Sequence, residues 1–174
     1  MLVEGIGLVQ NMRVFVVSDS HGRNTYLNKA LEQAGPFDYF LHLGELEGSE
    51  DFIEAFVEVP KELISGNNDY FSDIEREKVI ELAGHRIFMT HGNRYGVHAG
   101  VDCLREEGIK KEADIILFGH THCPYIEQEE VVIVNPGSIT HPRQEGRIPT
   151  YVLMDLKDNG EVEIELKYVK SYVD

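Results

Sequence analysis

Two histidines stand directly behind a predicted buried strand. The apolar residues 115–118 run into Gly119, and His120 and His122 follow with one residue between them. Imidazole is the commonest metal ligand among side chains, and it also carries protons near neutral pH. Two such rings at one strand end indicate a site that does chemistry.

The other predicted strands end in similar residues, usually beside a glycine, which lets the backbone turn sharply. The full set of candidate ligands is Asp19, His21, Glu45, Asn67, His91, His120 and His122. In open α/β sheets, ligands gather at the carboxyl ends of the strands. We therefore expect these side chains to converge.

Four imidazoles, two carboxylates and one amide oxygen form a mixed nitrogen and oxygen donor set. Such a set suits Mn, Fe, Co, Ni or Zn, and it suits Ca or Cu(I) poorly. Seven ligands exceed the needs of one tetrahedral ion, and they fit two divalent ions that share a bridging carboxylate. Two ions about 3.5–4 Å apart can activate a bridging water and hold a phosphoryl group for in-line displacement.

Each of these residues, taken alone, has a plainer interpretation. A lone His120 is usually a hydrogen-bonded surface histidine, and Asp19 in a turn usually forms an Asx-turn or a helix cap. Residues 67–69 and 135–138 alone would be ordinary loops. His42 lies inside a predicted strand, where a structural or ligand-supporting role is expected. The recurrence of ligand-type residues at five strand ends favours a metal site over these separate explanations.

Hydrophobic periodicity predicts the elements that position these residues. In the first half, strands alternate with helices, which favours parallel pairing with crossover helices. The predicted strands are 13–17, 38–44 and 61–66. One helix buries Leu27, Ala30, Leu31 and Ala34 and ends at Gly35-Pro36, and another, capped by Ser49, buries Phe52, Ile53 and Phe56.

The second half is richer in hairpins. A hairpin turning at Ala83-Gly84 joins residues 77–82 to 85–90, and a helix is expected around 98–107. Further strands are 114–119, 125–128, 131–135, 150–156 and 161–169, the last two flanking the turn signal 157–160. The pattern predicts one α/β domain with two sheets face to face.

Composition limits the choice of partner. The chain has 174 residues, and 16 basic against 31 acidic ones give a formal net charge of −15. This average field disfavours nucleic acid, although cations gathered at one site would still attract an anionic substrate. Two cysteines, Cys103 and Cys123, are too few for a disulfide scaffold and favour reduced thiols in the cytoplasm.

The N-terminal segment has no basic region, and Glu4 interrupts its apolar residues. It is therefore not interpreted as a signal peptide, and no apolar run approaches the ~18 residues needed to span a membrane. Met12 directly precedes the first strong strand. Residues 1–11 are accordingly a candidate N-terminal extension, followed by a single domain over residues 12–174.

The ordered motifs SDSHG, HLGE, GNND, THG, GHTH and NPGS resemble the calcineurin-like metallophosphoesterase family, in its small single-domain bacterial and archaeal phosphodiesterase branch. They span residues 18–138. The resemblance implies a four-layer α-β-β-α sandwich, with two mixed sheets packed together and helices outside.

The resemblance also implies ligand roles. Asp19, His21 and His122 would hold one metal, whereas Asn67, His91 and His120 would hold the other. Glu45 would bridge the two ions, and a bridging hydroxide would attack phosphorus. The expected catalytic residues are Asn67 and His91 from this set, together with Asp69.

Three positions depart from the family pattern. Glu45 stands where the family usually has the shorter aspartate, so its carboxylate must reach the bridge through a backbone shift or a different rotamer. Asn68 replaces a histidine that protonates the leaving group in many members, so good leaving groups or a water held by Asp69 would be needed. Asn93 replaces the second histidine of an HGH motif, and it is not expected to bind metal.

Arg23, Asn24 and Asn68 are the candidate substrate-binding residues, and Arg94 is another arginine beside a ligand motif. The leading hypothesis is a metal-dependent phosphodiesterase for small phosphoesters, with two divalent ions and Mn²⁺ as first choice. One alternative is a catalytically weak or inactive protein-interaction scaffold of the same fold, and a structural zinc protein is a weaker one. A homodimer through exposed strand edges is left open.

Overall fold

The computed structural model describes residues 11–171. The proposed N-terminal extension, apart from Asn11, lies outside this range. Within the described part, no helix is long and apolar enough to cross a membrane.

The first sheet has five strands in the order β10-β9-β1-β2-β3. Its bounds are β1 Met12–Val17, β2 Tyr39–His42, β3 Lys61–Leu63, β9 Thr150–Leu156 and β10 Val162–Tyr168. β1, β2 and β3 pair in parallel through the crossover helices α1 (Thr25–Ala34) and α2 (Glu50–Phe56). The predicted strand–helix alternation is therefore confirmed, and β9 and β10 add the predicted hairpin to the other side of β1.

The second sheet has the order β4-β5-β6-β8-β7. Its bounds are β4 Glu77–Leu82, β5 His85–Thr90, β6 Ile115–Leu117, β7 Pro124–Gln128 and β8 Val132–Pro136. β4 and β5 form the predicted hairpin, and Ala83 and Gly84 both have positive φ, at 48° and 81°. Two positive φ values are what a tight two-residue hairpin turn requires.

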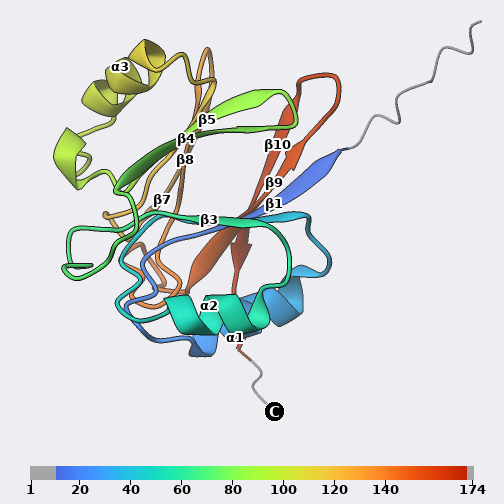
Figure 1. Cartoon of the computed structure of the whole chain (residues 1–174), viewed down its shortest axis with the longest axis vertical. Coiled ribbons are helices and arrows are strands. Elements are labelled where there is room, and N and C mark those ends of the chain that lie inside the picture. The colour runs from blue at the N-terminus through green and yellow to red at the C-terminus, as the bar shows by residue number, and fades with distance from the viewer. Residues whose placement is uncertain (1–10, 172–174) are drawn as a thin grey trace, which may run out of the picture.

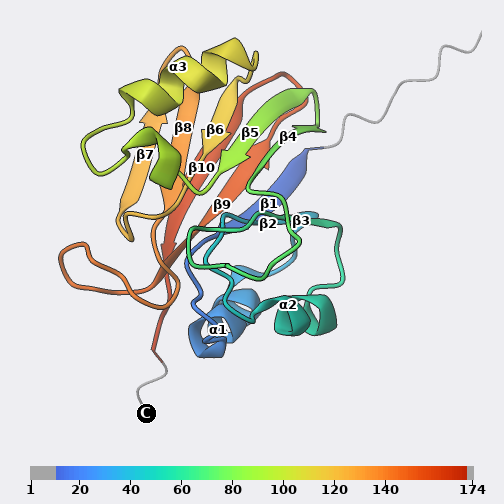
Figure 2. The ribbon, with the colours of Figure 1, turned by 60° about the vertical axis from the view of Figure 1, so that its left-hand side comes forward.

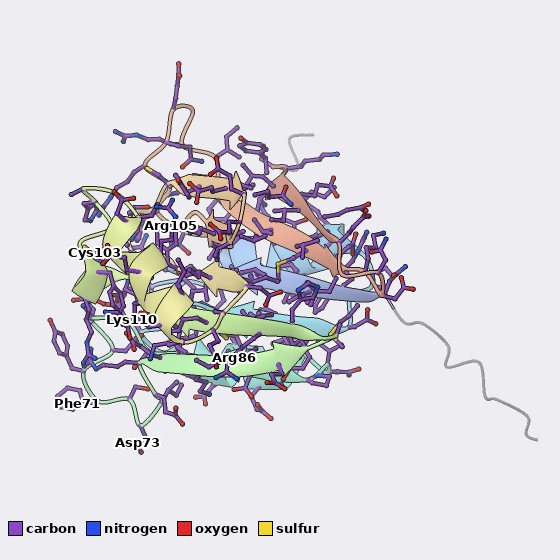
Figure 3. All side chains as sticks on the ribbon, turned by 90° about the horizontal axis from the view of Figure 1, so that it is seen from above. Phe71, Asp73, Arg86, Cys103, Arg105 and Lys110 are labelled. Atoms are coloured by element: carbon purple, nitrogen blue, oxygen red, sulfur yellow. The ribbon has the colours of Figure 1, made fainter. Side chains whose placement is uncertain are left out.

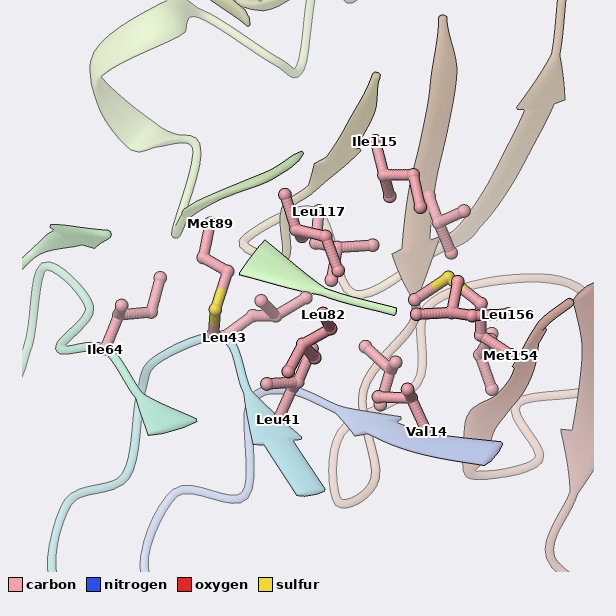
Figure 4. Close-up of a cluster of buried hydrophobic side chains, with 14 residues drawn as sticks. Val14, Leu41, Leu43, Ile64, Leu82, Met89, Ile115, Leu117, Met154 and Leu156 are labelled. Carbon is pink, nitrogen blue, oxygen red and sulfur yellow. The ribbon is translucent and has the colours of Figure 1, made fainter. Parts of the chain in front are cut away.

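The two sheets pack face to face, with helices on both outer sides (Figures 1 and 2). Between them lies a fully apolar core that includes Val14, Leu41, Met89, Leu117 and Met154 (Figure 4). A second cluster, with Phe15, Leu27 and Ile53, packs α1 and α2 against the first sheet. The expected four-layer sandwich is confirmed.

The third helix, α3 (Asp102–Lys110), covers the second sheet through Leu104 (Figure 3). The helix begins four residues after the expected start at residue 98. Residues 93–95 form a short 3-10 helix instead, and Gly96 and Gly100, which both have positive φ, lie in the loop between the two helices. This loop borders the candidate site through His98.

Two expectations about α2 are wrong. Ser49 occupies the N-cap position, but its side chain makes no cap hydrogen bond and instead accepts one from Ser20 Oγ at 2.9 Å. Phe56 is 63% exposed, and only Ile53 of the predicted apolar face is buried. Phe52 stacks on Phe56 at the edge of the helix, with ring centroids 4.6 Å apart.

Candidate metal centre

The predicted ligands converge where the two sheets meet. Asp19, His21, Glu45 and Asn67 follow strands of the first sheet, and His91, His120 and His122 follow strands of the second. The loops that carry them gather on the left-hand side of Figure 1. A pocket of about 190 Å³ is lined by six of the seven, Asp19, His21, Glu45, Asn67, His120 and His122, and by Asn68, His98 and Arg143.

His91, the seventh predicted ligand, does not line the pocket but is buried beside two residues that do. Its Nε2 is 3.4 Å from Glu45 Oε1 and 3.7 Å from Asp19 Oδ1. The ring is 1% exposed. The structure therefore brings together all seven residues that the sequence analysis selected.

The backbone is strained at the residues that converge. Five of the seven have φ in the left-handed region: Asp19 at 56°, His21 at 49°, Glu45 at 58°, His120 at 70° and His122 at 59°. Non-glycine residues avoid this region, and each costs on the order of 1–3 kcal/mol unless the surroundings enforce it. Backbone hydrogen bonds between loops provide that enforcement, including those from Asp19 N to Gly44 O and from His21 N to Glu45 O.

Asp19 is the central carboxylate. Its Oδ2 accepts hydrogen bonds from Ser18 Oγ at 2.6 Å and from His120 N at 3.2 Å. Its Oδ1 is 3.3 Å from His122 Nε2 and 3.9 Å from His21 Nε2. Burial opposes ionisation, but the neighbouring imidazoles of His122 and His91 and the hydrogen bond from Ser18 lower the pKa of Asp19 to about 2. The group is thus an anion at neutral pH.

The histidine rings are oriented by acceptors on their far sides. His91 Nδ1 donates to Leu43 O at 2.7 Å, and His122 Nδ1 donates to His141 O at 2.8 Å. A carbonyl can only accept, so each Nδ1 carries a proton, and Nε2 is the ring atom that faces the carboxylates of the centre. His21 Nδ1 is paired in the same way with the carboxylate of Glu47. Backbone carbonyls and carboxylates behind metal-binding imidazoles are the usual arrangement.

His120 completes the group of rings. Its centroid lies 5.2 Å from that of His91 and 4.8 Å from that of His98. Burial, with the charges of His91 and His98, lowers the pKa of His120 to about 4. The ring is therefore neutral at neutral pH, which is the form that binds metal.

Several buried polar atoms at this centre have no hydrogen-bond partner. Among the described residues they include Asp19 Oδ1, Glu45 Oε2, Asn67 Oδ1 and His91 Nε2. A buried polar atom without a partner costs about 1–3 kcal/mol, so four of them in one place call for an explanation. Three oxygen donors and a nitrogen donor are what a divalent transition metal takes up, and the donor atoms of Asp19, His21 and His122 lie within 4.8 Å of one another. The residues fit a metal centre.

The chain also matches a known protein family. A family model described as the calcineurin-like phosphoesterase superfamily domain matches residues 12–159. The chain belongs to this superfamily.

Three similar proteins illustrate its range. A probable metallophosphoesterase of Methanothermobacter thermautotrophicus is 34% identical over 76% of this chain and 80% of its own length. A phosphodiesterase of Methanocaldococcus jannaschii is 26% identical over 90% of this chain and 100% of its own. The crystal structure of Vps29 from Entamoeba histolytica, complexed with zinc, shares the fold with a TM-score of 0.71, 20% identity, and coverage of 91% of this chain and 100% of that one.

Among the other residues selected from the sequence, Asp69 has a different environment from the one expected. Its carboxylate accepts hydrogen bonds from three backbone N–H groups, those of Leu46, Glu47 and Gly66, at 3.2, 2.8 and 2.7 Å. These bonds hold the Glu45 loop against the Asn67 loop. This arrangement suits a role in positioning the two loops, and it does not support the predicted catalytic role of Asp69.

The candidate substrate-binding residues separate into two groups. Asn68 lines the pocket, and its backbone N–H donates to Glu45 Oε1 at 3.1 Å. Arg23 is exposed and Asn24 stands at the start of α1, and neither lines the pocket. Arg94 is exposed on the 3-10 helix, also outside the pocket.

The buried His42 donates from Nε2 to Ser20 Oγ at 2.9 Å and accepts a hydrogen bond at Nδ1 from Gly44 N, which agrees with its predicted structural role.

Four residues at the site were missed. Glu47 supports His21, His98 packs on His120, the His141 ring lies 5.2 Å from the His21 ring, and Arg143 lines the pocket. Glu47 follows Glu45 by two residues and could have been noticed as a nearby carboxylate. The others lie in long loops without a motif, so only the tertiary structure brings them to the centre.

Replacement of Glu47 by glutamine is expected to weaken metal binding. The charge behind His21 Nδ1 would be lost, and loss of such a supporting carboxylate typically costs about 10–100-fold in metal affinity. Metal titration of wild type and Glu47→Gln measures the effect. Glu54→Gln removes the same charge from an 81% exposed side chain and serves as the control. Equal affinities in the two variants would contradict the role of Glu47.

Gly119 is expected to tolerate no side chain. An alanine Cβ there would lie 2.1 Å from Ser18 Oγ and 2.8 Å from Asp19 Oδ2, so Asp19 would have to move. A displacement of about 1 Å in a catalytic centre can cost about 10²-fold in rate. Gly108→Ala is the matched control, because its Cβ would lie 2.2 Å from Ile116 Cδ1, inside the core and away from the site. Activity per folded molecule should fall in Gly119→Ala only, and an equal fall in both would contradict the prediction.

Proposed function

We propose that the chain is a metal-dependent phosphodiesterase that hydrolyses small phosphodiesters. The observation that carries this proposal is the cluster of buried, unpartnered donor atoms on Asp19, Glu45, Asn67 and His91. Such a cluster destabilises the fold unless a ligand satisfies it, and the three other predicted ligand histidines, His21, His120 and His122, line the adjoining pocket.

Asp19, His21 and His122 would hold one divalent ion, and Asn67, His91 and His120 a second, with Glu45 shared between them. Mn²⁺ is the first choice, and Fe, Co, Ni or Zn suit the same donors. When bound, the ions would supply Lewis-acid stabilisation of the phosphoryl oxygens and activation of a water. They would also offset the acidic background of a chain with net charge −15.

The chain's own side chains would bind and orient the phosphate. Arg143 lines the pocket and can form paired hydrogen bonds with phosphate oxygens, a role for which the sequence had suggested Arg23. Asn68 lies on the pocket wall with its side chain exposed, and its amide can donate a hydrogen bond to the same group. Asp69 would act only indirectly, by keeping the Glu45 and Asn67 loops together.

An amide such as Asn68 cannot transfer a proton to a departing alkoxide. The proposed enzyme would therefore favour substrates whose leaving groups need little protonation, such as aryl esters. The scaffold alternative is opposed by the complete set of ligand-type residues and by the strained backbone that presents them. A scaffold would have no use for either feature.

The test uses the purified full chain, stripped with chelator and reloaded with single metals. Turnover of bis-p-nitrophenyl phosphate should appear with Mn²⁺ and disappear again with chelator. Metal analysis should find two ions per chain. No turnover with any of the five metals, together with no bound metal, would reject the enzyme and favour the scaffold. A single bound ion with turnover would reject the shared-carboxylate role of Glu45.

A further inference from the structure

A second cavity adjoins the metal centre. It has a volume of about 490 Å³, within the ordinary range of about 300–1,000 Å³ for small-molecule sites. It shares His98 with the metal pocket, and Thr121, which stands between His120 and His122, forms part of its wall. A molecule held by its phosphate at the metal centre could therefore extend into it.

Apart from His98, Thr121 and Cys123, the residues that line this cavity are apolar. Val97, Val101 and Phe118 are 6%, 9% and 2% exposed, and Pro124 and Tyr125 also line the cavity. The rings of Phe118 and Tyr125 have centroids 6.1 Å apart, with 58° between their planes. Among the described residues that line it, none is an aspartate, glutamate, lysine or arginine. Such a cavity favours an uncharged group, and Tyr125, which is 37% exposed, offers an aromatic face for contact with a planar one.

The wall residue Tyr125 is held in place from outside. Its hydroxyl donates to Glu127 Oε1 at 3.1 Å, and Arg105 on α3 donates to both oxygens of Glu127 at 2.8 and 2.7 Å. The ring of Tyr125, on the edge strand β7, is thus linked through Glu127 to Arg105 on α3. A fixed aromatic wall lowers the entropy lost when a ligand binds against it.

We propose that this cavity is a substrate-specificity subsite, which binds a planar, uncharged aromatic or heteroaromatic ester group of the phosphoester. The inference rests on the proposed function, because the metal centre must hold the phosphate. Within that function it names the substrate class: phosphoesters that carry a neutral ring rather than a short alkyl or a charged group. Three features support it: continuity with the metal centre, the apolar walls, and the fixed ring of Tyr125.

The test compares ligands that share a phosphonate group, cannot be hydrolysed and differ in the attached group. Phenylphosphonate should bind Mn²⁺-loaded wild-type protein at least about tenfold more tightly than methylphosphonate, because the ring buries apolar area that the methyl group lacks. Isothermal titration calorimetry measures both. An adenine phosphonate with a two-carbon spacer is the third ligand. Tighter binding of this compound would indicate a nucleobase on a spacer, and tighter binding of phenylphosphonate would indicate a directly attached aryl group.

Two variants test whether the phenyl ring of the ligand binds in this cavity. Ala99→Trp places a large side chain at the cavity from an exposed position, and Tyr125→Ala removes the aromatic wall. Both should bring the phenyl-to-methyl affinity ratio to near one. Tyr168→Ala, which removes a 52% exposed ring on β10 outside the cavity, should leave the ratio unchanged.

The outcomes separate the two proposals. If both phosphonates bind wild type with equal affinity, the metal centre stands and the subsite is rejected. A wild-type preference that survives in both Ala99→Trp and Tyr125→Ala would also reject it, because the ring would then bind elsewhere. If neither phosphonate binds the metal-loaded protein, the proposed function fails and the subsite fails with it.

Discussion

Asp19→Asn should abolish turnover while the chain stays folded. Asp19 is completely buried, accepts hydrogen bonds at Oδ2 from Ser18 and His120, and has an unpartnered Oδ1 that faces His122 and His21. Asparagine keeps the size and the hydrogen-bonding oxygen but removes the charge that would hold a cation. Loss of several kcal/mol of transition-state stabilisation corresponds to about 10³-fold or more in kcat/KM.

A second measurement on Asp19→Asn separates metal binding from folding. Mn²⁺ should raise the Tm of wild type, because a ligand at a hundred times its Kd stabilises by about 2.7 kcal/mol. It should raise the Tm of Asp19→Asn much less, although both apo proteins unfold cooperatively. Asp155→Asn, which removes a carboxylate paired with Arg13 in the first sheet, is the control and should behave like wild type toward Mn²⁺. An Asp19→Asn protein with wild-type rates would reject the metal centre.

The second large effect is expected at Glu45. Its Oε1 accepts from Asn68 N and lies 3.4 Å from His91 Nε2, and its Oε2 has no partner. Burial raises the pKa of this carboxyl, so an isolated Glu45 is costly to ionise and a bound cation would restore the anion. Glu45→Gln should therefore lower kcat/KM by about 10²–10³-fold and reduce the metal content from two ions to one or none.

Glu45→Asp provides the matched comparison, because it keeps the charge and shortens the side chain by one methylene. The structure shows what accommodates the longer side chain. A Cβ on Gly66 would lie 2.9 Å from Glu45 Oε1, so the glycine leaves the space that the glutamate occupies. Glu45→Asp should keep two metals and lose at most about tenfold in rate. Glu62→Gln removes a carboxylate on β3 and serves as the control, which should change neither the metal content nor the rate. Equal loss in Glu45→Asp and Glu45→Gln would show that length, and not charge, is what matters at this position.

Much of the architecture could be predicted from local patterns. Strands such as 13–17 and 85–90 have continuous apolar or β-branched runs, and the turns at Ala83-Gly84 and at 157–160 carry residues that tolerate tight reversal. Once parallel pairing was inferred, the strand ends had to lie along one edge. The convergence of Asp19, Glu45 and Asn67 follows from that topology, whereas His91 reaches them because the second sheet packs against the first.

The remainder depends on contacts between distant segments. Ser49 has a residue type typical of a helix cap, but the neighbouring Ser20 hydroxyl engages its side chain instead. Arg143 and His98 lie in irregular loops, and no periodicity indicates where such loops turn. Asp69 resembles a catalytic acid in sequence, and only its three backbone partners show that it holds two loops together.

The placement of the ligands on two sheets has a consequence for unfolding. His21 and His122 are 101 positions apart in the chain, and they follow strands of different sheets, yet their Nε2 atoms lie 3.2 Å from each other. Ions held jointly by these groups would act as removable cross-links between the two β-layers, much as a disulfide joins remote segments. Local opening of one layer without the other would then require the release of metal, so the loaded protein should exchange its amide hydrogens as one cooperative unit, and chelation should let the layers open separately.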